Sequence, residues 1–69
     1  MRERREFMKY KLALLGKTLT GLADYMGMHR NSIYFKLEGK VLTTEEEKKM
    51  MQEYAELTDK ENKELWRNK

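Results

Sequence analysis

One stretch constrains the fold of this chain more than any other, namely GKTLTGLADYMGMHRNSIYFKLEGK in its middle. Apolar residues recur there at helical spacing on both sides of a glycine: Leu22 and Met26 precede Gly27, and Ile33 and Leu37 follow it. Only glycine easily adopts the left-handed backbone that a steep turn between two helices needs. The stretch therefore predicts two short helices joined by a tight turn, which is a helix-turn-helix.

Composition places the chain among small all-α proteins. It has 69 residues, 0 Pro and 4 Gly, and β-branched residues are sparse, so we expect one helical domain over residues 1–69. Hydrophobic and charged residues each make up 39%, which leaves a small core that a dimer interface would help to stabilise. The sequence has no apolar run that could span a membrane and 0 Cys, so we expect a cytoplasmic protein without disulfides.

The positive charge is concentrated in one half of the chain. Residues 1–43 contain nine basic and four acidic residues, whereas residues 44–69 contain six basic and eight acidic ones. The predicted helix-turn-helix lies in the basic half, as expected for a surface that faces nucleic-acid phosphates.

The chain resembles the lambda-repressor-like (Cro/repressor, XRE-type) family of helix-turn-helix DNA-binding domains, and most closely its short phage-repressor branch. The resemblance covers residues 8–66, and the positions that carry it are Leu22, Ala23, Gly27, Ile33, Leu37, Gly39 and Lys40. It implies a compact five-helix domain with the motif at helices 2 and 3. We expect helices near residues 3–15, 19–26, 30–37, 45–56 and 59–66.

The same resemblance implies a phage or prophage protein that acts in a bacterial host cell. Its partner would be a double-stranded DNA operator with two-fold symmetry. A homodimer would place two reading helices about 34 Å apart on one face of the DNA. No cofactor, metal or small-molecule substrate is implied.

In this family the third helix reads the bases, and the positions carried over are Arg30, Asn31, Tyr34 and Phe35. Arginine can bond guanine O6 and N7 with two hydrogen bonds, and asparagine can do the same to adenine N6 and N7. Tyr34 or Phe35 would pack on a thymine methyl group. Packing in the core or in an interface is the alternative for Phe35.

The resemblance also implies contacts to DNA phosphates by Lys17, Thr18, His29, Ser32, Lys36 and Lys40. Thr18 or Thr20 caps the second helix, and the family pattern favours Thr18. His29 would cap the third helix, either beside a phosphate or as an exposed cap without a further role.

Two positions depart from the family pattern. Leu19 stands where a glutamine is common, which removes an amide that contacts the DNA backbone. Glu38 stands where an asparagine is common, which puts a negative charge near the DNA. Gly21 lies inside a helix, where it costs about 0.5–1 kcal/mol relative to alanine, and close approach of the DNA backbone or of another helix is one explanation for it.

The first helix has two apolar stripes. Met8, Leu12 and Leu15 form the core stripe, and Phe7, Tyr10 and Leu14 form a second one. The second stripe either receives Leu65 and Trp66 from the C-terminus or forms a dimer face. Arg2, Arg4 and Arg5 are either a basic arm that reaches DNA or a frayed, solvated end.

The fourth and fifth helices each begin with a capping box. Thr44 is followed three residues later by Glu47, and Thr58 by Glu61. The run of glutamates in the fourth helix is therefore attributed to capping rather than to a metal or catalytic cluster. The core positions expected in and beside this helix are Met50, Met51, Tyr54, Leu57 and Leu42.

Together these features predict a sequence-specific DNA-binding regulator. The alternative is a protein-binding module, such as an antirepressor or antitoxin, built on the same skeleton, because Leu19, Tyr34 and Phe35 make the reading face unusually apolar. An enzyme is not expected, since the sequence has no nucleophile–base pair, no metal-ligand cluster and no phosphate-binding glycine loop.

Overall fold

The structure is a computed structural model that describes residues 4–67. It contains five helices: α1 (Arg4–Leu14), α2 (Leu19–Met26), α3 (Arg30–Leu37), α4 (Glu45–Ala55) and α5 (Asp59–Leu65). No described residue lies in a strand, so the all-α prediction is confirmed for this part of the chain. The bounds of α2 and α3 match the prediction. Arg2 of the predicted arm, Glu3 of the predicted first helix and the last two residues lie outside the described range.

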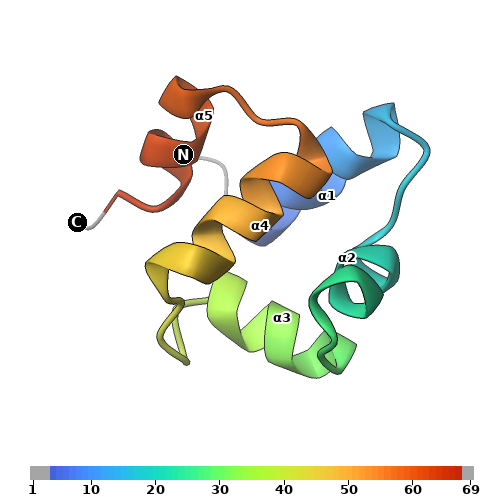
Figure 1. Cartoon of the computed structure of the whole chain (residues 1–69), viewed down its shortest axis with the longest axis vertical. Coiled ribbons are helices and arrows are strands. Elements are labelled where there is room, and N and C mark those ends of the chain that lie inside the picture. The colour runs from blue at the N-terminus through green and yellow to red at the C-terminus, as the bar shows by residue number, and fades with distance from the viewer. Residues whose placement is uncertain (1–3, 68–69) are drawn as a thin grey trace.

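The helices enclose one core, with α4 in front of α1 and α5 beside the N-terminal end of α1 (Figure 1). The buried hydrophobic residues are Met8, Leu12, Leu19, Leu22, Ala23, Ile33, Leu37, Met51, Ala55, Leu57 and Leu65. Leu19, where the family pattern commonly has glutamine, is buried and belongs to this core. None of the helices formed by residues 4–67 is both long enough and apolar enough to cross a membrane.

The turn between α2 and α3 is built as its sequence predicts. Gly27 has φ 69° and ψ 33°, the left-handed conformation, and its N–H donates to the Asp24 carbonyl at 3.1 Å. The Met28 N–H then donates to the Ala23 carbonyl at 2.9 Å, which satisfies a carbonyl group in the last turn of α2. At the other end of α2, Thr18 Oγ1 accepts from the Gly21 N–H at 3.0 Å, so Thr18 and not Thr20 is the cap.

Both predicted capping boxes are present. Thr44 and Glu47 exchange backbone–side-chain hydrogen bonds at the start of α4, and Thr58 and Glu61 do so at the start of α5. Each box satisfies N–H groups that a helix start otherwise leaves unpaired. The starts of the last two helices are therefore fixed by hydrogen bonds between residues close together in the chain.

The C-terminal helix closes onto α1, as one of the two sequence interpretations proposed. Leu65 is buried, and its carbonyl accepts from Arg4 Nε at 2.7 Å. Of the second stripe of α1, only Phe7 packs against the core, whereas Tyr10 and Leu14 stay 49% and 63% exposed. Leu15, expected in the core, is also exposed.

Three of the core positions predicted in and beside α4 are confirmed, because Met51 and Leu57 are buried and Tyr54 packs against the core. Met51 and Ala55 are buried, whereas Met50 is only partly buried. Glu47, Met51 and Ala55 are spaced at i, i+4 and i+8, so a glutamate occupies the first position of the inward stripe. Leu42 was also expected in the core but is 83% exposed.

Gly21 is required by the packing of an aromatic ring. A Cβ atom at Gly21 would lie 2.7 Å from the Tyr54 hydroxyl oxygen. That ring cannot move away easily, because the Tyr25 ring lies 4.9 Å from it and Lys17 Nζ lies 4.4 Å from its centroid. Close approach of Tyr54 thus explains a helix-weakening glycine in α2.

We therefore expect Gly21→Ala to destabilise the protein by about 1 kcal/mol despite the better helix propensity of alanine. In a Tyr54→Phe background the clashing oxygen is absent, and the same change should stabilise by about 0.5 kcal/mol. Urea unfolding of the four proteins measures this reversal of sign. A destabilisation of equal size in both backgrounds would contradict the assigned contact.

Glu56, which follows α4, has φ 54° and ψ 45°, a left-handed conformation that favours glycine. We expect Glu56→Gly to raise the free energy of unfolding by about 0.5–1 kcal/mol, measured as a higher thermal midpoint. The matched control is Glu53→Gly, at an exposed position within α4, which should lower it by about 1 kcal/mol. Destabilisation by both changes would show that Glu56 makes a contact that outweighs its strain.

Candidate nucleic-acid interface

Helix α3 has one buried face and one exposed face. Ile33 and Leu37 are buried, which fixes the rotation of the helix on the core. Arg30, Asn31 and Phe35 are exposed, and they were all predicted to read bases. The structure therefore leaves all three side chains exposed: Asn31 and Phe35 lie one turn apart on one face of α3, and Arg30 lies at its N-terminal end.

Tyr34, the fourth predicted reading residue, is placed differently. It is partly buried and packs against the core, and the guanidinium carbon of Arg5 lies 4.2 Å from the centroid of its ring. Such a stacked arginine holds an aromatic ring in place. Tyr34 therefore lies between α1 and the outer face rather than on it.

Arg5 also compensates the charge of Glu38, the acidic residue at the end of α3. Its Nη1 donates to Glu38 Oε2 at 3.0 Å, and Lys40 Nζ lies 3.5 Å from the other carboxylate oxygen. The negative charge of Glu38 is thus met by two cations. Sequence reasoning missed this role of Arg5, because no local spacing links residues so far apart in the chain.

The N-terminal arginines in the described range do not form an arm. Arg4 donates to the Leu65 carbonyl, and its guanidinium carbon lies 5.2 Å from the Trp66 ring centroid. Arg5 is held by Tyr34 and Glu38. Both arginines belong to α1 and dock on the protein, so neither the arm nor the frayed end describes them.

Lys36 is directed inward, which contradicts its predicted contact with DNA phosphate. Its side chain is only 10% exposed, and Nζ donates to the Leu42 carbonyl at 2.9 Å and lies 3.1 Å from Glu47 Oε1. A buried ammonium needs such partners, because leaving it unpaired is costly. Lys36 therefore joins the end of α3, the following loop and the start of α4.

The pKa values of Glu47 and Glu61 are both lowered by their hydrogen bonds and nearby lysines. A hydrogen bond from the Thr44 backbone N–H, together with Lys36, keeps the pKa of Glu47 below its ordinary value. The Thr58 backbone N–H and the Lys11 ammonium do the same for the pKa of Glu61. Each carboxylate thus caps a helix and pairs with a lysine of another helix.

These two carboxylates should make the protein sensitive to acid. Because folding lowers both pKa values, their stabilisation is complete above the ordinary glutamate pKa of about 4.3 and is lost as pH falls through the folded-state values. We expect the urea midpoint to fall below about pH 4. The fall should be less steep in Glu47→Gln and in Glu61→Gln than in the unmodified protein. Identical acid slopes in all three proteins would contradict this origin.

The ammonium group of Lys17 also bonds to groups of the protein itself, so it is not free to bind phosphate. Its Nζ donates to the Tyr54 carbonyl at 2.8 Å and lies over the Tyr54 ring. That carbonyl belongs to the last turn of α4, where carbonyl groups lack helical partners and a cation is favoured. Lys17 therefore caps the C-terminal end of α4.

The remaining predicted phosphate-binding residues lie at or near the surface of α2, α3 and the segments beside them. Thr18 and His29 are exposed caps of α2 and α3, and His29 Nδ1 accepts from the Asn31 N–H at 3.1 Å. Ser32 is partly buried in the first turn of α3. Lys40 follows α3, and its side chain is 67% exposed.

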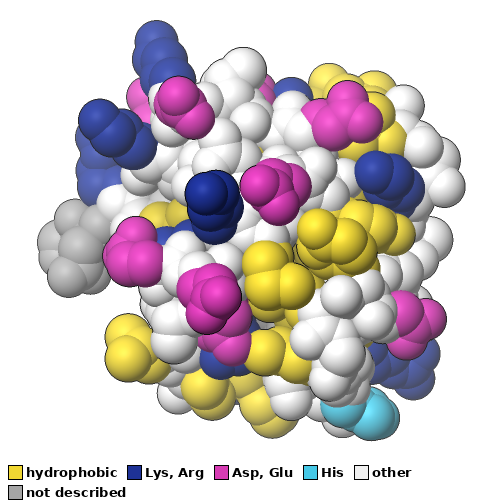
Figure 2. All heavy atoms as spheres, viewed as in Figure 1, with side chains coloured by type: hydrophobic (Ala, Val, Ile, Leu, Met, Phe, Trp, Pro, Cys, Tyr) yellow, Lys and Arg dark blue, Asp and Glu magenta, His cyan; other side chains and the backbone are white. Residues whose placement is uncertain are grey.

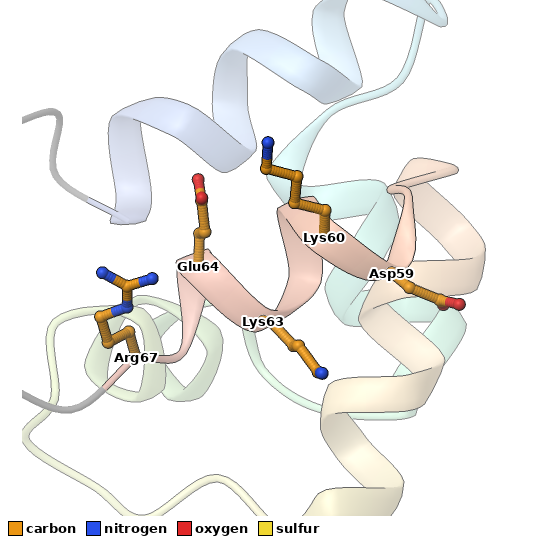
Figure 3. Close-up of a pocket in the computed structure, with 5 residues that line it drawn as sticks. All are labelled: Asp59, Lys60, Lys63, Glu64 and Arg67. Carbon is orange, nitrogen blue, oxygen red and sulfur yellow. The ribbon is translucent and has the colours of Figure 1, made fainter.

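The hollow that the structure shows on α5 is not a convergent small-molecule site. A surface hollow on α5 is lined by Asp59, Lys60, Lys63, Glu64 and Arg67. These side chains point in different directions and do not meet around a common centre (Figure 3). Within residues 4–67, no cluster of three or more acidic or histidine side chains is arranged to hold a metal ion.

Comparisons of the chain with protein-family models, with curated proteins and with solved structures found no match. The exposed face of α3 is therefore the feature of this chain that best supports a functional proposal.

Proposed function

We propose that this chain is a sequence-specific double-stranded DNA-binding regulator of the lambda-repressor-like type, in which α2 and α3 form a helix-turn-helix. The observation that carries the proposal is the outer face of α3. There Arg30, Asn31 and Phe35 are exposed, while Ile33 and Leu37 fix the helix to the core. A helix held in this way can enter a major groove without losing further conformational entropy.

Each exposed side chain has a matching partner on the edges of the bases. Arg30 would bond guanine, Asn31 would bond adenine, and Phe35 would pack on a thymine methyl group. Thr18 and His29 mark the N-terminal ends of α2 and α3, which favour phosphate oxygens. Regulation would follow from occupancy, because a bound operator is closed to other proteins.

A protein-binding role is the second candidate, and the placement of the lysines favours it. Lys17 and Lys36 are held within the protein, which leaves fewer cations for phosphate than the sequence predicts. Ionic strength separates the two roles. Binding through phosphate contacts weakens steeply with salt, whereas an apolar protein interface responds little.

Selection of bound duplexes from a random DNA pool at moderate salt, followed by sequencing, tests the proposed function. We expect enrichment of a motif that contains a guanine and an adenine at the positions read by Arg30 and Asn31. Absence of any enriched sequence, with only weak and salt-sensitive retention, would refute sequence reading.

A further inference from the structure

Helix α3 lies at the edge of the molecule, and its first turn is open to solvent. The helix forms the lower edge of Figure 1, and Figure 2 shows the chain's single histidine, His29, at that edge. His29 Nδ1 accepts from the Asn31 N–H at 3.1 Å, so the backbone of this turn is already ordered. A DNA duplex can therefore reach Asn31 without displacing another helix.

The side-chain amide of Asn31 is available for an external partner. Asn31 is exposed, and its side chain makes no hydrogen bond with any residue in the described range of the chain. An amide offers an acceptor oxygen beside a donor nitrogen, and adenine presents the matching donor N6 and acceptor N7 in the major groove. Adenine is therefore the base that satisfies both groups of Asn31 at once.

Phe35 supplies an apolar neighbour to this amide. It lies one turn after Asn31 on the same face of α3 and is 44% exposed. Four residues of helix advance by about 6 Å, so the ring covers the groove edge next to the base that Asn31 reads. An apolar ring offers a bridging water no hydrogen-bond partner, so a group of Asn31 that loses its base contact stays unsatisfied.

A methyl group on adenine N6 removes the donor that Asn31 needs. In an A·T pair one N6 hydrogen bonds thymine, and the other points into the major groove. N6-methylation replaces the hydrogen in the groove by a methyl group. The Asn31 oxygen then faces carbon instead of a donor, while the rest of the base pair is unchanged.

We propose that this chain distinguishes methylated from unmethylated DNA, because a methyl group on N6 of the adenine read by Asn31 excludes it from its operator. The inference rests on the proposed function and adds a chemical signal that regulates occupancy. The ligand is thus a duplex in which this one adenine is unmethylated.

Synthetic duplexes of the selected operator, each with N6-methyladenine at one position, test the proposal by fluorescence anisotropy. We expect methylation of the adenine read by Asn31 to weaken binding at least about tenfold. Methylation of an adenine outside the motif should leave the affinity unchanged.

Two variants assign the effect to Asn31. Asn31→Ala keeps the backbone N–H that bonds His29, and it should bind methylated and unmethylated duplexes equally. Arg30→Ala is the matched control, since it removes an exposed neighbouring side chain that reads another base. It should weaken binding to both duplexes and keep the ratio between them.

An unmodified protein that binds every methylated duplex as tightly as the unmethylated one would overturn the inference. So would an Asn31→Ala variant that still discriminates, because another residue would then face the adenine. Selection from the random pool is a separate measurement. An enriched motif without methylation sensitivity refutes this inference alone, whereas absence of any enriched motif refutes the proposed function itself.

Discussion

Replacing Lys36 by methionine should lower the free energy of unfolding by about 3 kcal/mol. The side chains of Lys36 and Glu47 are only 10% and 19% exposed, and their charged atoms lie 3.1 Å apart. Removal of the ammonium leaves the largely enclosed carboxylate without its cation and with only the Thr44 N–H as a donor, and it also removes the donor to the Leu42 carbonyl. Urea unfolding at neutral pH measures the loss.

A double-mutant cycle separates the charge from the packing. Glu47→Gln keeps an acceptor for the capping box but removes the charge, so Lys36→Met/Glu47→Gln should recover part of the stability lost in Lys36→Met. Lys40→Met is the matched control. It removes a lysine whose carboxylate partner is 3.5 Å away and whose side chain is 67% exposed, and it should cost less than about 0.5 kcal/mol. Equal losses from Lys36→Met and Lys40→Met would show that Lys36 does not anchor the loop.

The features that sequence predicted well depend on residues close together in the chain. The bounds of α2 and α3, the left-handed Gly27 and the capping boxes at Thr44 and Thr58 all agree with the structure. Each depends on hydrogen bonds or steric limits within a few residues. Local sequence therefore determines where these helices begin and end.

The errors concern the direction of long side chains. Lys17 and Lys36 were expected to face phosphate. Instead, Lys17 contacts the C-terminal end of α4 and Lys36 contacts its N-terminal end. A lysine side chain can extend into solvent or fold back onto the protein. Which direction it takes depends on acceptors that only folding brings close to it. The place of Glu47 on the inward stripe of α4 has a related cause, because its carboxylate is paired with Lys36 and accepts from the Thr44 N–H.

Of the site itself, the sequence predicted the exposed positions of α3 but not what supports them. Arg30, Asn31 and Phe35 lie on the outer face as expected. The contacts of Arg5 with Tyr34 and Glu38 join α1 to α3, and no periodicity in the chain indicates them. Such a support becomes visible only when the packing of the helices is known.

Replacing Arg30 by alanine should weaken binding to the selected operator by about 1–3 kcal/mol, which is about 5- to 150-fold in affinity. The loss should be confined to duplexes with guanine at one position, and the variant should accept other bases there. Because Arg30 is exposed, the thermal midpoint should stay unchanged. Fluorescence anisotropy with the operator and its single-base variants measures both affinity and discrimination.

Two matched variants make this result specific to base reading. Arg67→Ala removes an exposed arginine after α5, outside the face formed by α3, and it should leave the affinity unchanged. Lys40→Ala removes an exposed cation beside the reading helix, and it should weaken all duplexes alike and reduce the salt dependence. If Arg30→Ala behaved like Lys40→Ala, Arg30 would contact phosphate rather than guanine, and the bases would be read by Asn31 and Phe35 alone.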